Sequence, residues 1–200
     1  MEKEILQLFL YEKKLKFSEI EKSLNIRSNK IAYHLKNLVK RKILEKSDDD
    51  YQLTETAEKI IPYLSEKNSP LPVILVAVFK NKNKVFLHKR NKRPFKEKLS
   101  LPGGRIFDGE SVKEAVKRIM KKYFIEANLK KINSVSLEQV KKQKRKIHSF
   151  LLILVTAETK DKILFTNIEK NKSKIISSDY KLMKNDLDKE IKINKFLTRD

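Results

Sequence analysis

All three glycines of this 200-residue chain lie in the stretch LPGGRIFDGES, which spans residues 101–111. A chain needs glycine where its backbone takes a positive φ or comes very close to another group. The demand for unusual backbone geometry is therefore concentrated in this one loop. Two interpretations stay open: either the turn itself requires the glycines, or the loop and its cations hold an anion such as a phosphate group.

The chain divides into two parts that differ in charge and in pattern. Residues 1–68 carry 14 Lys and Arg against 12 Asp and Glu, whereas residues 69–200 carry 33 against 14. Between them, residues 65–72 are polar and include two prolines, which resist both helix interiors and central strands. Because helical periodicity dominates before this break and strand-like runs after it, we expect a two-domain α+β protein. The expected parts are a domain over 1–67, a linker over 68–72 and a domain over 73–200.

Composition narrows the classes of function. The net charge of +21 favours an anionic partner, either a nucleic acid or a phosphorylated ligand. The chain has no cysteine, which excludes disulfides and cysteine metal sites. The longest apolar run is too short to span a bilayer, and the first residues lack the pattern of a signal peptide. We therefore expect a cytoplasmic protein that does not interact with membranes.

The first part of the chain predicts short helices followed by a hairpin. Apolar spacing predicts helices over 4–14 and 28–41. Ser18 and Glu21 have the spacing of a capping box, which predicts that another helix begins at Ser18, between these two helices. Residues 43–53 predict two strands joined by a polar tip. Thr54 then predicts the start of a closing helix that extends to residue 64.

The helix over 28–41 is a candidate DNA-binding element. Residues 27–42 contain six basic residues and no acidic one, although the first 68 residues are close to neutral. A helix in a DNA major groove needs cations for phosphates and polar side chains for base edges. The same composition also suits a solvated helix face. The predicted DNA contacts are Arg27, Ser28, Asn29, Lys30, Tyr33, His34, Asn37 and Arg41.

Residues 4–64, with three helices, a β-hairpin and a closing helix, resemble the winged helix-turn-helix domains of prokaryotic transcription regulators. The resemblance implies double-stranded DNA as a partner. One departure is the hairpin tip, where Asp48, Asp49 and Asp50 stand in place of the family's basic residues. Because carboxylates repel phosphate, binding would depend on the helix over 28–41. A homodimer would present two such helices to two half-sites.

The second part predicts a sheet with helices. Residues 72–79 form a buried strand pattern, and residues 85–90 pair back after a turn. A helix is predicted over 112–120, with its buried side formed by apolar residues at helical spacing, namely Val112, Ala115, Val116, Ile119 and Met120. Two strands near 134–140 and 148–156 predict a hairpin with a basic tip. A last helix is predicted over 186–197.

Residues 73–198 resemble the Nudix hydrolases, most clearly in LHKR…LSLPGGRIFDGES…EAVKR. The resemblance implies an α/β/α sandwich that uses Mg²⁺ to act on nucleoside diphosphates linked to another group. The family signature is Gly, five residues, Glu, seven residues, then Arg-Glu-apolar-any-Glu-Glu-any-Gly-apolar. The chain matches it at Gly104, Glu110 and Arg118. Its three later glutamate positions hold Ile119, Lys122 and Tyr123.

The missing glutamates predict a domain that binds without catalysis. Hard divalent cations need oxygen ligands, and the ammonium of Lys122 would repel them. We therefore expect no catalytic residue and no metal or cofactor. The glycine loop and nearby cations predict a nucleotide-type ligand. Its expected contacts are Arg90, Gly103, Gly104, Arg105, Glu110 and Arg118.

Three functions follow from the sequence. The first is a DNA-binding transcription regulator whose Nudix-like domain senses a nucleotide; bacterial regulators of NAD metabolism join similar domains in the opposite order. The alternative is a divergent Mg²⁺-dependent Nudix hydrolase that acts on a nucleoside diphosphate derivative, with an accessory winged helix. The third is a module that uses the basic second half to coat nucleic acid without sequence preference.

Overall fold

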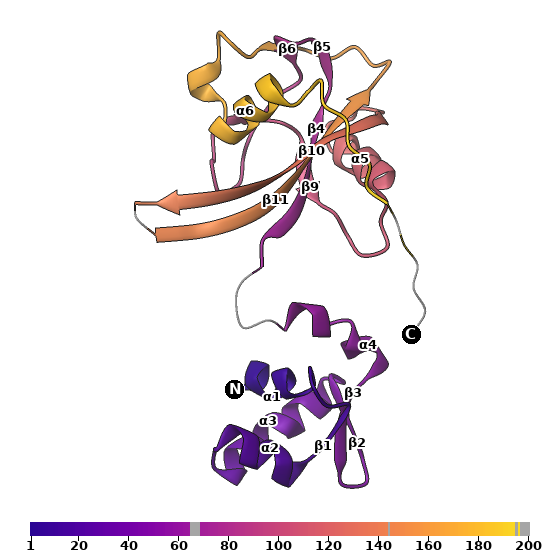
Figure 1. Ribbon diagram of the computed structural model, residues 1–200, viewed down its shortest axis with the longest axis vertical. Helices are drawn as coiled ribbons and strands as arrows, with labels where there is room; N and C mark the ends of the chain where they lie inside the picture. The colour runs from indigo at the N-terminus through magenta and orange to yellow at the C-terminus, as the bar shows by residue number, and fades with distance from the viewer. Residues whose placement is uncertain (65–68, 144, 195, 197–200) are drawn as a thin grey trace. The chain divides into compact units, whose positions relative to one another are not determined.

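The structure, a computed structural model, describes residues 1–64, 69–143, 145–194 and 196 (Figure 1). The chain forms two compact units, Met1–Ser69 and Pro70–Asp200, and each is described by itself. Both units combine helices with strands, so the chain has the mixed α and β content that the sequence predicts. Within the described residues, no helix is long and apolar enough to cross a membrane.

The N-terminal unit packs its helices against a small sheet. Buried residues from every part of the unit form one core, with Ile5, Ile20, Ile31 and Leu35 almost completely enclosed. The three strands have the order β1-β3-β2, and both pairings are antiparallel. Its elements are α1 (Glu2–Leu8), β1 (Lys14–Lys16), α2 (Phe17–Leu24), α3 (Ser28–Lys40), β2 (Leu44–Ser47), β3 (Asp50–Leu53), α4 (Glu55–Glu58) and a 3-10 helix (Ile61–Tyr63).

The helix and hairpin expected over 28–41 and 43–53 are present, but the first helix is shorter than expected. α1 ends at Leu8, and Lys14–Lys16 forms the strand β1 along β3. In β1, Leu15 is buried between two exposed lysines, which is the alternation of a half-buried strand. The prediction of a helix over 4–14 is therefore wrong in its second half.

The predicted capping box at Ser18 is also wrong. α2 begins at Phe17, and its N-cap is Lys16, two residues before the predicted cap. The Glu19 carboxylate accepts the Lys16 backbone N–H at 2.7 Å, which satisfies one of the free donors at the helix start. The Glu21 carboxylate instead accepts a hydrogen bond from the Ser28 hydroxyl, and so it connects α2 to the start of α3.

The closing helix begins as predicted but ends early. The Thr54 hydroxyl accepts the Ala57 backbone N–H at 3.3 Å, which confirms the cap. α4 stops at Glu58, however, and a 3-10 helix follows over Ile61–Tyr63. The predicted continuation to residue 64 is wrong because Pro62 has no N–H for the Glu58 carbonyl, and its ring crowds that carbonyl.

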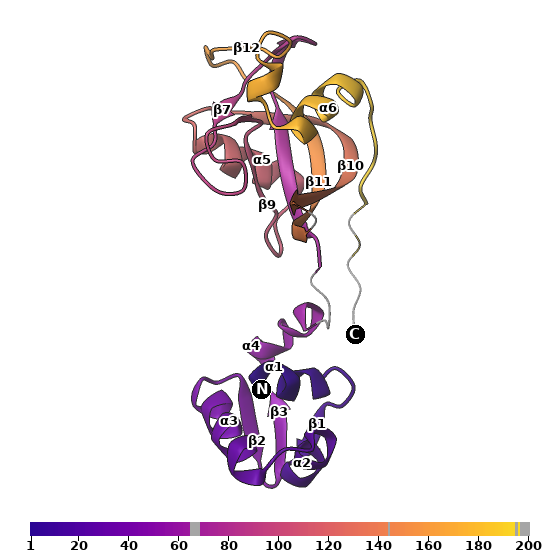
Figure 2. The ribbon, with the colours of Figure 1, turned by 90° about the vertical axis from the view of Figure 1, so that its left-hand side faces the viewer.

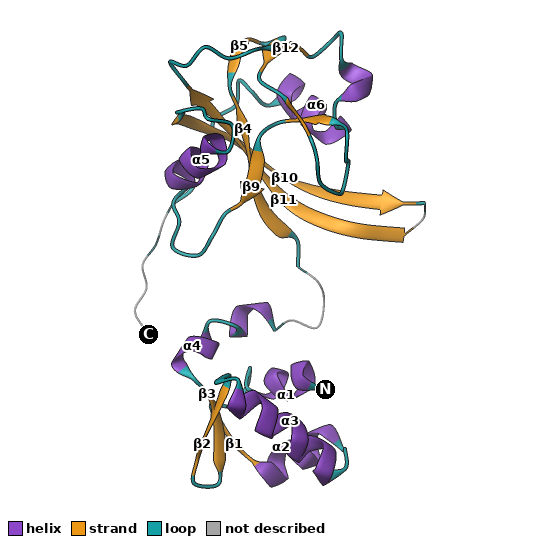
Figure 3. Cartoon of the chain, turned by 180° about the vertical axis from the view of Figure 1, so that it is seen from behind, coloured by secondary structure: helices purple, strands orange, loops and turns teal. Residues whose placement is uncertain are grey.

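The C-terminal unit is built on a four-stranded sheet of order β10-β11-β4-β9. β4 pairs with β11 in parallel, whereas the other two pairings are antiparallel. The helix α5 covers one face of the sheet and α6 the other (Figures 1 and 3), and each helix packs over its own apolar cluster. The bounds are β4 (Leu71–Ala77), β9 (Gly103–Arg105), α5 (Val112–Lys121), β10 (Asn128–Lys142), β11 (Arg145–Glu158) and α6 (Ser177–Asn185).

Shorter strands complete this unit. Three of them form a second sheet of order β12-β6-β5, and two more pair with each other ahead of the glycine loop (Figure 2). The strand expected over 85–90 is interrupted, because its two halves pair with different partners. The bounds are β5 (Phe79–Asn81), β6 (Lys84–Val85), β7 (His88–Lys89), β8 (Leu99–Ser100), β12 (Thr166–Asn167) and a 3-10 helix (Lys172–Lys174).

The hairpin β10–β11 is confirmed and is longer than expected. Its two strands pair from Asn128 with Glu158 up to Lys142 with Arg145 at the basic tip. Figure 3 shows this end of the hairpin reaching well past β4 and β9. Residue 144 within the tip lies outside the described residues.

The last helix lies earlier in the chain than predicted. α6 spans Ser177–Asn185, and residues 186–194 contain no helix. The Asn133 side chain donates to the carbonyls of Leu187 at 2.8 Å and Lys189 at 3.2 Å, which holds this segment along β10. Ile191 then donates its N–H to the Ile132 carbonyl at 2.9 Å. The helix predicted over 186–197 is wrong there; residues 195 and 197 lie outside the described residues.

Candidate functional site

The glycine loop is tightly packed at two of its three glycines. A Cβ on Gly103 would lie 2.9 Å from the Leu75 Cδ2 atom and 3.2 Å from the Ile74 carbonyl oxygen. A Cβ on Gly104 would lie 3.1 Å from the Ile119 Cγ1 atom. Gly109 has open space around it but a φ of +75°, which side chains rarely adopt. Each glycine therefore has a structural reason that requires no ligand.

We predict that Gly103→Ala lowers the free energy of unfolding by about 1–3 kcal/mol, because the added methyl group overpacks against Leu75 and a backbone carbonyl. Gly109→Asn serves as the matched control and should cost less than about 1 kcal/mol, since asparagine tolerates a positive φ and the site is open. Urea unfolding of the full chain measures both variants. Equal stability of Gly103→Ala and the unaltered chain would contradict the packing explanation.

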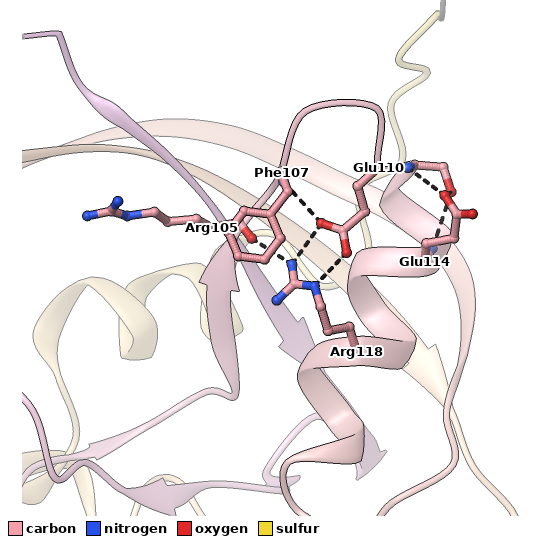
Figure 4. A network of polar contacts seen from close by, with 6 residues as sticks. Arg105, Phe107, Glu110, Glu114 and Arg118 are labelled. Carbon is pink, nitrogen blue, oxygen red and sulfur yellow. Dashed lines mark hydrogen bonds and ion pairs between the residues drawn. The ribbon is translucent and has the colours of Figure 1, made fainter. Parts of the chain in front are cut away.

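Next to the glycines, Arg118 and Glu110 form a paired group (Figure 4). The Arg118 Nε donates to Glu110 Oε1 at 2.5 Å, and its Nη2 donates to Glu110 Oε2 at 2.7 Å and to the Arg105 carbonyl at 2.8 Å. The Phe107 N–H also donates to Glu110, and the guanidinium lies 4.2 Å from the Phe107 ring centre. The hydrogen bonds from Arg118 lower the pKa of Glu110, and the carboxylate raises the pKa of Arg118.

This pair closes the loop onto α5. Of the predicted ligand contacts, the structure brings Arg105, Glu110 and Arg118 together, but Glu110 and Arg118 bind each other. The Arg105 side chain is exposed and points away from the pair, so only its carbonyl takes part (Figure 4). Arg105 is thus the loop cation that is turned toward solvent.

We predict that Arg118→Met destabilises the chain by about 1–2 kcal/mol at neutral pH, because Glu110 and the Arg105 carbonyl lose their charged donor. Arg105→Met, which leaves the pair intact, should have almost no effect. The pKa of Glu110 is lowered in the folded chain, so the stabilisation by Arg118 is present above the ordinary pKa of Glu110 and is lost as the pH falls. Chemical unfolding at neutral and acid pH tests this, and an Arg118→Met loss that persists unchanged in acid would contradict it.

The residues at the three later glutamate positions have different surroundings. Ile119 is fully buried in the core and packs on Gly104. Lys122 is exposed, and Tyr123 is half-buried, with its ring centre 5.9 Å from that of Phe86 and 4.8 Å from that of His88. The surrounding contacts are therefore apolar and aromatic where the family signature has carboxylates.

These residues do not fit a Mg²⁺ site. Both Glu110 oxygens accept hydrogen bonds from Arg118, and the Glu114 carboxylate accepts from the Ser111 N–H at 2.8 Å and its hydroxyl at 2.6 Å in a capping box. Within the described part of the chain, no three His, Asp or Glu side chains gather where they would hold a metal ion. An oxygen-rich cage of the kind that Mg²⁺ requires is not assembled from these donors.

Arg90, the remaining predicted contact, lies in a different place. It borders a cavity of about 80 Å³ on the α6 side of the sheet, together with Glu138 and Asp179. Its Nε donates to the Pro94 carbonyl at 2.6 Å, so the guanidinium organises its own loop. The structure therefore divides the predicted ligand contacts between two regions.

Asp179 is a buried acid that sequence reasoning missed. Its carboxylate accepts the Leu101 N–H at 2.8 Å and so holds the strand that leads into the glycine loop. Burial raises its pKa to about 7; Glu138 adds to this effect, while the Leu101 hydrogen bond and Arg90 oppose it. The available signal was an aspartate between the apolar pairs 175–176 and 182–183, where a buried helix face is expected.

In the N-terminal unit, α3 presents a continuous exposed strip. Asn29, Tyr33, Lys36 and Lys40 are all exposed, and Tyr33 is 64% exposed despite its aromatic ring. At 100° per residue these four positions lie on one side of the helix, opposite the buried Ile31, Leu35 and Leu38. Lys36 and Lys40 were not among the predicted contacts, although the helical spacing alone would have found them.

Two predicted DNA contacts face another helix instead. The Arg41 Nη1 lies 2.6 Å from Glu2 Oε2, and the His34 Nδ1 lies 4.0 Å from Glu2 Oε1, so both side chains are directed toward α1. Asn37 is half-buried at the edge of the strip, while Arg27, Ser28 and Lys30 are exposed near the start of α3. A DNA contact by Arg41 or His34 would require it to leave Glu2.

Comparison with known families agrees with the C-terminal architecture. Residues 69–176, more than half of the chain, match the NUDIX domain family, and the chain belongs to this family. Residues 3–64 match a domain of unknown function (DUF7347). The search of curated proteins found no match to the chain.

Several solved structures are similar to the chain. A NUDIX hydrolase from Nitrosomonas europaea shares 15% identity over 53% of this chain and 78% of its own, with a TM-score of 0.44. The MutT protein from Methanosarcina mazei Go1 shares 18% identity over 60% of this chain and 94% of its own, with a TM-score of 0.45. NrtR from Shewanella oneidensis shares 15% identity over 56% of this chain and 60% of its own, with a TM-score of 0.43.

Proposed function

We propose that the chain is a DNA-binding transcription regulator whose Nudix domain binds a nucleotide-type ligand without hydrolysing it. The observation that carries the DNA half is the exposed strip of α3, formed by Asn29, Tyr33, Lys36 and Lys40. It combines a carboxamide, a phenol and two ammonium groups on one helix face, and no acidic residue lies between 27 and 42. Such a face supplies both phosphate neutralisation and groups that contact base edges.

The proposal assigns the groups on α3 two different roles. Asn29 and Tyr33 lie toward the start of the helix, where recognition helices contact bases. Lys36 and Lys40, together with Arg27 and Lys30, contact phosphates and set the affinity. The tip residues Asp48 and Asp49 are exposed and repel phosphate, so the hairpin keeps away from the DNA backbone.

The non-hydrolytic half of the proposal is supported by the donors at the glycine loop. Glu110 is engaged by Arg118, and the later glutamate positions hold a buried Ile119, an exposed Lys122 and a Tyr123 packed between aromatic rings. Apart from Arg118, the basic side chains of the Nudix domain, which include Arg90 and Arg105, favour the binding of a phosphorylated ligand. Binding of that ligand would change the affinity for DNA by a coupling free energy of ~1–3 kcal/mol.

Selection from a randomised 30-base-pair duplex library tests this function. The full chain is used with and without added ATP or ADP-ribose, at a physiological salt concentration. We expect one sequence motif to be enriched and its recovery to change when the nucleotide is present. Recovery of duplexes without any motif, with an affinity that falls steeply as salt rises, would support a module that coats nucleic acid without sequence preference.

Family membership favours one second candidate, a divergent Nudix hydrolase. Glu110 matches the family signature, and Glu114 lies four residues further on, in the first turn of α5. Incubation of the full chain with ADP-ribose, dinucleotide polyphosphates and nucleoside triphosphates, in Mg²⁺ or Mn²⁺, distinguishes the two functions. We expect no turnover; turnover that Glu110→Gln abolishes while the variant stays folded would establish the hydrolase instead.

A further inference from the structure

A basic cleft lies on the C-terminal unit, away from the glycine loop. Its volume is about 780 Å³, and it is lined by Phe95, Lys98, Glu169, Lys170, Lys172, Ser173, Ile175, Ile176, Ser177, Tyr180 and Lys181. This volume is within the range of small-molecule sites. Ile175 and Ile176 are buried and contribute an apolar wall. The cleft is therefore large enough for a nucleotide, whereas the cavity beside Arg90, at about 80 Å³, is too small.

The charge of the cleft is strongly positive. Four ammonium groups line it, those of Lys98, Lys170, Lys172 and Lys181, and all four side chains are exposed. Lys98 donates to the Ser173 carbonyl at 2.9 Å, which fixes its position without neutralising its charge. No ion pair joins any of the four to a carboxylate within the described part of the chain.

The one acidic residue of the cleft, Glu169, is already engaged. Its Oε1 lies 2.7 Å from the Lys184 Nζ, and its Oε2 accepts the Tyr180 hydroxyl at 2.9 Å. These hydrogen bonds lower the pKa of Glu169, so the carboxylate stays ionised and paired. Because Lys184 compensates Glu169, the four lysines of the cleft remain available to an anion of several charges.

Two aromatic side chains accompany these lysines. Phe95 and Tyr180 are half-buried in the cleft, and the Lys172 Nζ lies 5.2 Å from the Tyr180 ring centre. Aromatic rings stack on bases of any sequence, and lysine ammonium groups act as point charges toward phosphate oxygens. A ligand with both an aromatic ring and a phosphate chain satisfies the two features together.

We propose that this basic cleft binds the phosphate chain of a nucleotide, with Phe95 and Tyr180 against its base or sugar. The proposal rests on the proposed function, which includes a nucleotide-type ligand, and it places that ligand at the α6 side of the sheet. The glycine loop is the less suitable place because Arg118 is bound to Glu110 there. Ile176, the residue before α6, donates its N–H to the Leu99 carbonyl at 3.0 Å and so joins this side of the unit to the strand ahead of that loop.

Calorimetric titration of the full chain with ATP tests the cleft. The double variant Lys172→Gln/Lys181→Gln removes two of its charges, and we expect its dissociation constant to rise at least about tenfold. The matched control Lys160→Gln/Lys162→Gln removes the same charge from exposed positions outside the cleft and should change it less than twofold. Coincident urea unfolding curves for the two variants and the unaltered chain show that all three are folded.

Three other outcomes would contradict nucleotide binding in this cleft. If Arg105→Gln weakens ATP binding and Lys172→Gln/Lys181→Gln does not, the nucleotide lies at the glycine loop, and the proposed function stands without the cleft. If the unaltered chain does not bind ATP, the cleft fails, and the duplex selection with ADP-ribose decides the proposed function separately. Binding of single-stranded RNA through the same lysines, with ATP unable to compete, would replace the nucleotide by a nucleic acid.

Discussion

Replacing Tyr33 with alanine will weaken binding of the full chain to its selected DNA sequence by about ten- to a hundredfold, while binding to unrelated duplexes changes little. The reason is that Tyr33 is 64% exposed on the strip of α3 and is uncharged, so it adds nothing to the general attraction between protein and phosphate. A good contact to a base edge contributes about 1–3 kcal/mol of discrimination. Asn29→Ala is expected to behave in the same way.

The lysines of the strip provide the contrast. Lys36→Gln/Lys40→Gln should weaken binding to the selected and the unrelated duplexes alike, and should reduce the salt dependence by the equivalent of about two phosphate contacts. Lys22→Gln/Lys59→Gln removes equal charge from exposed positions outside the strip and is the matched control. Fluorescence anisotropy at several salt concentrations measures all of these constants. If Tyr33→Ala weakened both duplexes equally, Tyr33 would be a positioning contact and would not read sequence.

The second large effect concerns pH and Asp179. This carboxyl has an ordinary pKa of 3.8 and a pKa of about 7 in the folded chain. Between these values the unfolded chain releases the proton while the folded chain keeps it, so stability falls as the pH rises and levels off above about 7. We expect the residue to remove about 2–3 kcal/mol of stability between pH 5 and pH 8.

Asp179→Asn should abolish this contribution. An asparagine oxygen still accepts the Leu101 N–H but does not ionise, so the variant should exceed the unaltered chain in stability at pH 8 and show a flatter pH profile. Glu138 and Arg90 also face this carboxyl, with opposite effects on its pKa. Glu138→Gln is therefore a second test, because it should lower the pKa of Asp179 and so narrow the pH range over which the chain loses stability. Urea unfolding from pH 5 to pH 8 checks both variants, and identical slopes in all three proteins would contradict the role of Asp179.

The sequence predicted those helices and strands whose hydrophobic pattern extends over many neighbouring residues. The helix over 28–40 was predictable because Ile31, Leu35 and Leu38 repeat at helical spacing, and the hairpin because a polar tip separates two strand patterns. The unusual backbone of the glycine loop was predictable because all three glycines lie within residues 101–111. Strand β1 was not, since three residues around Leu15 are too short to show a period and depend on β3 for their pairing.

Other features depend on residues far apart in the chain. Residues 186–194 were wrongly predicted as helical because Asn133 binds the Leu187 and Lys189 carbonyls across more than 50 residues. The site around Asp179 is likewise formed from strand β10, the loop after β7 and α6, which only the folded sheet brings together. By contrast, the partnership of Glu110 with Arg118 was within reach, because both lie at fixed positions of one short motif.

Recognition of a DNA sequence by the chain is measured by the ratio of two dissociation constants. The full chain is titrated into the selected duplex and into a duplex of the same composition with shuffled sequence, at the same physiological salt concentration. We expect the shuffled duplex to bind at least about a thousandfold more weakly. A ratio close to one, with both affinities falling equally as salt rises, would contradict it.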